Sequence, residues 1–127
     1  MMRRLGLAAI FFLLSACSDY VEELPGGYIF ISESKDQKWI EPENARTGDP
    51  YIPCTVEAHD SNARFIVARQ RPTERCVAEG ENPMAHLIGR EFFWIIDVRT
   101  HTFYGPYGRP EFEAKRKELA VPPSLEV

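Results

Sequence analysis

The sequence has little that would mark an enzyme or a metal site. It contains only three histidines and three cysteines in 127 residues. The histidines (His59, His86 and His101) lie far apart and lack the short spacing typical of zinc ligands. The chain also has no Cys-x-x-Cys pair and no Gly-x-Ser-x-Gly nucleophile turn. We therefore expect no metal, no cofactor and no catalytic residue, and the sequence predicts that the protein is not an enzyme.

Long apolar runs and an excess of positive charge are missing as well. The longest apolar run, Leu5–Leu14, has ten residues, whereas a helix that spans a bilayer needs about 20. Lys and Arg total 15 against 19 Asp and Glu, which gives a formal net charge of −4. Because a nucleic-acid-binding face needs clustered basic residues, the composition argues against nucleic acid as a partner.

The N-terminus has the pattern of an export signal. Arg3 and Arg4 precede the apolar run, and the small residues Ser15 and Ala16 follow it. A charged start, a short apolar core and small residues are the three parts of a secretory signal peptide. We therefore predict that residues 1–16 are a signal peptide.

Leu14-Ser15-Ala16-Cys17 resembles the lipobox of bacterial lipoproteins. In such proteins the Cys thiol receives diacylglycerol, the chain is cut before the Cys, and the new amino group is acylated. The resemblance implies that Cys17 anchors the protein to a membrane through fatty acyl chains such as palmitate, and two or more chains bind stably. Ordinary secretory cleavage nearby is the alternative. Because Ser18 rather than Asp follows Cys17, we expect the periplasmic face of the outer membrane if the host is Gram-negative.

Cleavage before Cys17 would leave 111 of the 127 residues, enough for one small domain. It removes two arginines and no acid, so the formal charge changes from −4 to −6. We expect residues 17–27 to be the lipidated Cys with its tether and residues 28–127 to be a single globular domain. Cys54 and Cys76 form an even pair in an exported chain, which predicts a disulfide. Two free thiols and a metal pair are the alternatives.

Short β-branched and aromatic runs between Pro, Gly and polar turns predict strands. Glu91–Val98 is the most apolar run after the signal and predicts a strand buried on both faces. Pro110, the acidic residues after it and the basic residues 115–117 predict a C-terminal helix. The fold class is therefore α+β, with four to six antiparallel strands in hairpins and one C-terminal helix. The other expected strands are Tyr28–Ser32, Lys38–Ile40, Cys54–Ala58, Ala63–Ala68 and Thr102–Tyr104.

The aromatic residues near the C-terminus suggest a binding surface. Alternation along a strand sends half of them to each face of the sheet. One set builds the core, and the helix, with only Phe112 and Leu119 to offer, covers part of the other face. We predict the uncovered part as a binding surface, around Tyr104, Tyr107 and Tyr51 of the loop 41–53.

Two polar sites in the sequence are candidates for catalysis. Asp97 ends the apolar strand, and we expect its carboxylate to accept hydrogen bonds in the following turn rather than to act as a buried acid. His59 and Asp60 are expected to form an exposed pair at a hairpin turn.

Several motifs resemble a family of small uncharacterised bacterial lipoproteins. They are Trp94-Ile95-Ile96-Asp97, Tyr104-Gly105-Pro106, the acidic start of the Lys/Arg-rich helix, and Tyr20–Leu24 with Gly26-Gly27-Tyr28 at the domain start. The resemblance covers most of the chain after the signal. It implies no known activity and adds no catalytic residue.

Together these features predict a membrane-anchored bacterial envelope lipoprotein that is a non-enzymatic binding module. The expected partner is an envelope or secreted protein, and an inhibitor or immunity-type role fits, because an acidic domain complements a basic enzyme. The alternatives are a hydrolase of envelope polymers and a purely structural surface lipoprotein.

Overall fold

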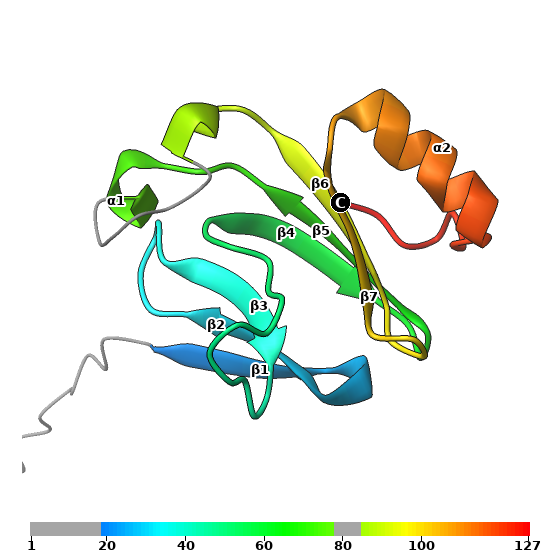
Figure 1. Ribbon diagram of the computed structural model, residues 1–127, viewed down its shortest axis with the longest axis horizontal. Coiled ribbons are helices and arrows are strands. Elements are labelled where there is room, and N and C mark those ends of the chain that lie inside the picture. Colours follow the sequence, from blue (N-terminus) through cyan, green and yellow to red (C-terminus); the bar gives the residue numbers. More distant parts are fainter. Residues whose placement is uncertain (1–18, 78–84) are drawn as a thin grey trace, which may run out of the picture.

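The computed structural model describes residues 19–77 and 85–127, which form three layers (Figure 1). The predicted signal peptide, Cys17 and residues 78–84 lie outside the described residues. Sheet A contains β1 (Tyr20–Leu24), β2 (Tyr28–Ser32) and β3 (Lys38–Pro42). Sheet B contains β4 (Val56–Ser61), β5 (Phe65–Gln70), β6 (Phe92–Asp97) and β7 (Thr102–Tyr107). The helices are α1 (Glu74–Val77), a single turn, and α2 (Arg109–Leu119), with short 3₁₀ turns at Pro25–Gly27 and Ala85–Leu87.

The α+β class with a C-terminal helix is confirmed, and the described residues contain more strands than expected. Both sheets are antiparallel, and within each sheet every strand pairs with the next along the chain. The expected range of four to six strands was too low, since β1 was not recognised. Residues 20–24 were assigned to a tether, but Tyr20 pairs with Ser32 and Leu24 with Tyr28. Two consecutive glutamates made this segment look polar, although Leu24 is buried in the core.

Sheet B is buried on both faces, because successive side chains along its central strands point to opposite faces and both sets are largely apolar. In β5, Ile66 and Ala68 face sheet A, whereas Phe65 and Val67 face α2. All six residues of β6 are buried, as the sequence predicted for this run. Burying a large apolar side chain contributes roughly 1.5–3 kcal/mol, so the two central strands supply much of the stability.

Sheet A covers one face of sheet B. Tyr28, Phe30 and Ile40 pack against the side chains of β5 and β6 that face them. At one end of this interface Gly26 lies against Val98, and a Cβ built on Gly26 would come within 2.6 Å of the Val98 Cβ. The close approach of the two chains therefore depends on a glycine at this position.

The helix α2 and the C-terminal tail cover the other face (Figure 1). Phe112 stacks on Phe93 with ring centroids 4.8 Å apart. The helix ends at Leu119, because Ala120 adopts the left-handed conformation and its N–H caps the last turn. Arg116 then donates hydrogen bonds to the carbonyls of Pro122 and Leu125, which brings the tail back over the sheet.

The predicted disulfide joins Cys54 to Cys76, whose Cα atoms lie 5.8 Å apart. It connects the segment before β4 to α1, beside the turn between β2 and β3. The Thr55 hydroxyl donates to the Asp36 carbonyl (2.6 Å), and the Gln37 amide donates to the Arg75 carbonyl (3.3 Å). Residues 33–37, the disulfide and α1 together form one end of the molecule. We call it the disulfide end.

The opposite end of the molecule, which we call the far end, consists of the turns at 62–64 and 98–101. Asp97 pairs with both Phe65 and Thr102, so the two turns lie next to each other. The strands of sheet A run between the same two ends, because Tyr20, Ser32 and Lys38 align at the disulfide end, while Tyr28 contacts His101 at the far end.

The packing of the two sheets can be tested at the adjacent glycines 26 and 27. Both have positive φ, but only Gly26 meets Val98, since nothing lies within 4 Å of a Cβ built on Gly27. Gly27→Ala should lower the free energy of unfolding by about 1 kcal/mol through backbone strain alone. Gly26→Ala should cost roughly 2–4 kcal/mol, because the clash adds to the same strain. Urea denaturation measures both, and equal losses would contradict the proposed contact between the sheets.

Candidate binding surface

The structure does not bring the three predicted tyrosines together. Tyr51 is 49% exposed and lies on the side of sheet A. Tyr104 and Tyr107 pack on the opposite face of sheet B beside α2, where they are partly buried. The Lys115 ammonium lies 5.3 Å from the centre of the Tyr104 ring. Two of the three tyrosines therefore support the helix, and Tyr51 belongs to a different surface.

Tyr51 lines a groove of about 210 Å³ at the edge of sheet A, next to the disulfide. The groove is lined by Gln37, Trp39, Tyr51, Pro53, Cys54 and Cys76. Among the residues that the structure describes, no carboxylate, histidine or lysine lines it, so this lining is suited to apolar and stacking contacts. We call these six residues the aromatic groove.

The alternation of buried residues explains how the chain builds the aromatic groove. Ile40 and Ile52 form a β-bridge across the edge of sheet A, and both side chains are fully buried. Their neighbours Trp39, Tyr51 and Pro53 must then point outward, because successive side chains of an extended chain alternate. Trp39 was missed as a site residue, although its place beside the buried Ile40 was the signal that could have revealed it.

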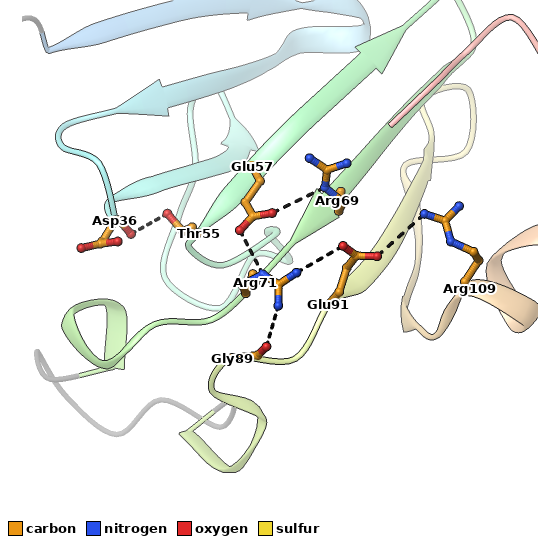
Figure 2. A network of polar contacts seen from close by, with 8 residues as sticks. All are labelled: Asp36, Thr55, Glu57, Arg69, Arg71, Gly89, Glu91 and Arg109. Carbon is orange, nitrogen blue, oxygen red and sulfur yellow. Dashed lines mark hydrogen bonds and ion pairs between the residues drawn. The ribbon is translucent and has the colours of Figure 1, made fainter.

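A network of charged side chains occupies the other side of the disulfide end (Figure 2). The Arg71 guanidinium donates to the Gly89 carbonyl (2.7 Å) and contacts the carboxylates of Glu57 (3.1 Å) and Glu91 (3.3 Å). Arg69 contacts Glu57 at 3.5 Å, and Arg109 contacts Glu91 at 3.8 Å. The network thus connects β4, β5, the start of β6 and the start of α2.

Asp97 and His59, the polar residues considered for catalysis, also have structural partners. The Asp97 carboxylate accepts a hydrogen bond from the Arg99 N–H (3.1 Å), which confirms its expected place in the turn, and it lies 3.6 Å from Arg64. His59 is not at an exposed turn as expected. It lies within β4, with its Nε2 3.2 Å from the Glu22 carboxylate on β1. The β4–β5 pairing includes Asp60 and Ser61, two polar residues that the sequence suggested would form the turn.

His101 contacts sheet A. Its Nδ1 lies 2.9 Å from the hydroxyl oxygen of Tyr28, and burial raises the pKa of Tyr28 above its ordinary value of 10.0. Within residues 19–77 and 85–127, no three His, Cys, Asp or Glu side chains are grouped so that they could bind a metal ion. In the same part of the chain, no helix is long and apolar enough to cross a membrane.

The charged network yields a prediction at Arg71. Arg71→Lys keeps the charge but removes the planar fork that contacts three partners at once. Because the Arg71 side chain is 39% exposed, solvent screening limits the loss of unfolding free energy to about 1 kcal/mol. Arg75→Lys is the matched control, since Arg75 is 83% exposed and lies 4.0 Å from the Asp36 carboxylate. Chemical denaturation of both variants should show a loss for the first alone, and an unaffected Arg71→Lys protein would contradict the stabilising role.

Comparison with known proteins places the chain in a family. A family model described as "Protein of unknown function (DUF3997)" matches residues 25–127, which include all of β2 to β7 and both helices. No curated protein and no solved structure matches the chain. Since the match covers most of the chain, the protein belongs to this family of unknown function.

Proposed function

We propose that the protein is an exported lipoprotein of the bacterial cell envelope, anchored through Cys17, that acts as a non-enzymatic binding module. Its expected location is the periplasmic face of the outer membrane in a Gram-negative host. The observation that carries the proposal is the start of the fold at Tyr20, three residues after Cys17. Three extended residues span about 10 Å, so an anchor on Cys17 would keep the first strand directly at the membrane.

The disulfide supports the export part of this proposal. Disulfides persist in oxidising compartments such as the periplasm and the cell surface, and are rare in the cytosol. Cys54 and Cys76 are bonded to each other, which leaves Cys17 as the third cysteine of the chain. The lipobox residues Leu14–Cys17 give that remaining cysteine a specific role.

The binding part of the proposal rests on a contrast between polar side chains that are engaged within the fold and apolar side chains that face solvent. Asp97 and His59, the two side chains considered for catalysis, contact other parts of the fold. The aromatic groove, in contrast, presents apolar side chains to solvent. Such a surface contributes binding free energy when a partner or a membrane buries it.

An anchor at Cys17 also orients the domain. Tyr20 lies at the disulfide end, so this end would face the membrane and the far end would point away from it. We propose that an envelope or secreted protein meets the far end, where Ala63, Arg99 and Thr100 are exposed.

The anchor is tested by Cys17→Ser, a change that retains size and polarity but cannot form the thioether. The variant should disappear from the membrane fraction of the host and appear in a soluble fraction. Wild-type protein and a Cys54→Ser/Cys76→Ser double variant serve as controls, because both retain Cys17. A Cys17→Ser protein that stays with the membranes would contradict lipidation at this residue.

The partner proposal is tested by photo-crosslinking in the living host. A photoreactive amino acid at Thr100 should give a discrete protein adduct, whereas one at Glu74 should not. Both side chains are exposed, and they lie at opposite ends of the molecule. A discrete adduct from Glu74 alone, or none from several far-end positions, would argue against a partner at the far end.

A further inference from the structure

The outer face of sheet A carries an apolar row that no part of the described structure covers. Val21 is aligned with Ile31 on the next strand, and Ile31 with Trp39 on the third. Val21 is 60% exposed, and the other two are partly exposed. The aromatic groove lies beside Trp39. The Ile40–Ile52 bridge places Pro53 opposite Trp39 and places Tyr51, which also lines the groove, one row further along. We call Val21, Ile31 and Trp39, with Tyr51 beside them, the apolar row.

The next outward-facing row differs in character. It consists of Glu23, Ile29 and Glu41, so carboxylates flank its centre. Across β1, β2 and β3 the apolar character is therefore confined to the row nearest the disulfide end. Four large apolar residues are exposed in the described part of the chain, and all lie at this end or beside the aromatic groove. They are Tyr20, Val21, Tyr51 and Ile88, the last next to Gly89, whose N–H donates to the Pro72 carbonyl.

The apolar row lies next to the proposed anchor. Val21 follows Cys17 by four residues, a reach of at most about 14 Å, and β1 begins between them. Neighbouring strands lie about 4.8 Å apart, so the three aligned residues Val21, Ile31 and Trp39 span about 10 Å across the end of the sheet. A lipid on Cys17 would therefore keep the whole row within reach of the membrane surface.

The charge at the disulfide end also suits a membrane surface. The protein as a whole is acidic. The disulfide end, however, carries Glu33, Asp36 and Glu74 against Lys35 and Arg75, and Asp19 and Lys38 border it. These charges nearly cancel, so repulsion from anionic headgroups is weak, and the long basic side chains can reach toward the headgroups.

We propose that the apolar row is a second membrane contact, which docks the disulfide end of the domain into the headgroup region of the bilayer that carries the lipid anchor. This inference rests on the proposed lipidation of Cys17 and assigns an occupant to the aromatic groove. Tryptophan and tyrosine favour the membrane–water interface, because they combine an apolar ring with a polar atom. The contact adds apolar burial to the acyl anchor and fixes the domain's orientation.

The experiment uses the lipidated full-length protein, purified from membranes and reconstituted into vesicles of phosphatidylethanolamine and phosphatidylglycerol. Some vesicles contain phospholipids brominated near the glycerol, which quench tryptophan at short range. The chain has two tryptophans, and Trp94 is buried between the sheets with a hydrogen bond to Gln70. The difference between wild type and Trp39→Phe therefore reports Trp39 alone.

Brominated lipid should remove about half of the Trp39 emission, since interfacial groups lie roughly 5–10 Å into the headgroup–acyl boundary. Vesicle-bound protein whose Trp39 is not quenched by bromine but is quenched by aqueous iodide would overturn docking and leave the anchor intact. The same result is expected if the groove serves a protein partner instead, because the purified vesicles contain no partner to cover Trp39. Wild-type protein that does not float with the vesicles would overturn the anchor itself, and with it this inference.

A second variant tests the row without touching the fluorophore. Val21→Glu places a charge on an exposed position of the edge strand and should reduce the bromine quenching of Trp39 at least twofold. Glu23→Gln, one row further from the anchor on the same strand, is the control and should leave the quenching unchanged. Equal quenching in wild type and Val21→Glu would overturn the contribution of the row.

Discussion

The burial of sheet B on both faces is the constraint on which the rest of the fold depends. The chain from Phe92 to Asp97 is buried at every residue, so neither face of β6 can meet water. A sheet with two apolar faces requires two covers, which are sheet A on one side and α2 with the C-terminal tail on the other. Each large side chain buried there contributes more than a partly exposed ion pair such as those around Arg71. The charged network therefore adjusts a structure that apolar packing has already determined.

This arrangement also decides where the aromatic groove lies. Sheet A must turn its apolar residues Tyr28, Phe30 and Ile40 toward sheet B, and alternation then sends Ile31 and Trp39 outward. The disulfide connects α1 to the segment before β4, which places it beside Trp39 and Tyr51. Because β1 begins at Tyr20, the groove and the proposed anchor occupy the same end of the molecule.

Much of this fold could be predicted from the sequence, and the failures have physical causes. The β2 strand, the doubly buried β6, the C-terminal helix and the Cys54–Cys76 bond were expected, because periodicity, length and cysteine number signal them. β1 was missed since its glutamates face solvent or a partner such as His59, a tertiary contact that no local pattern reveals. The grouping of Tyr51 with Tyr104 and Tyr107 relied on a single sheet, and the second sheet placed them on opposite sides of the core. Which residues lie near the proposed anchor depends on strand register, which the sequence alone did not give.

We propose that the folded domain lies directly on a membrane with its disulfide end toward the bilayer. Paramagnetic broadening of backbone amide signals by gadolinium chelates on lipid headgroups measures this orientation for the lipidated protein in lipid nanodiscs. We expect strong loss of signal for residues 33–37 and α1, and little loss for the turn at 98–101. Equal broadening at both ends, or stronger broadening at 98–101, would contradict the account.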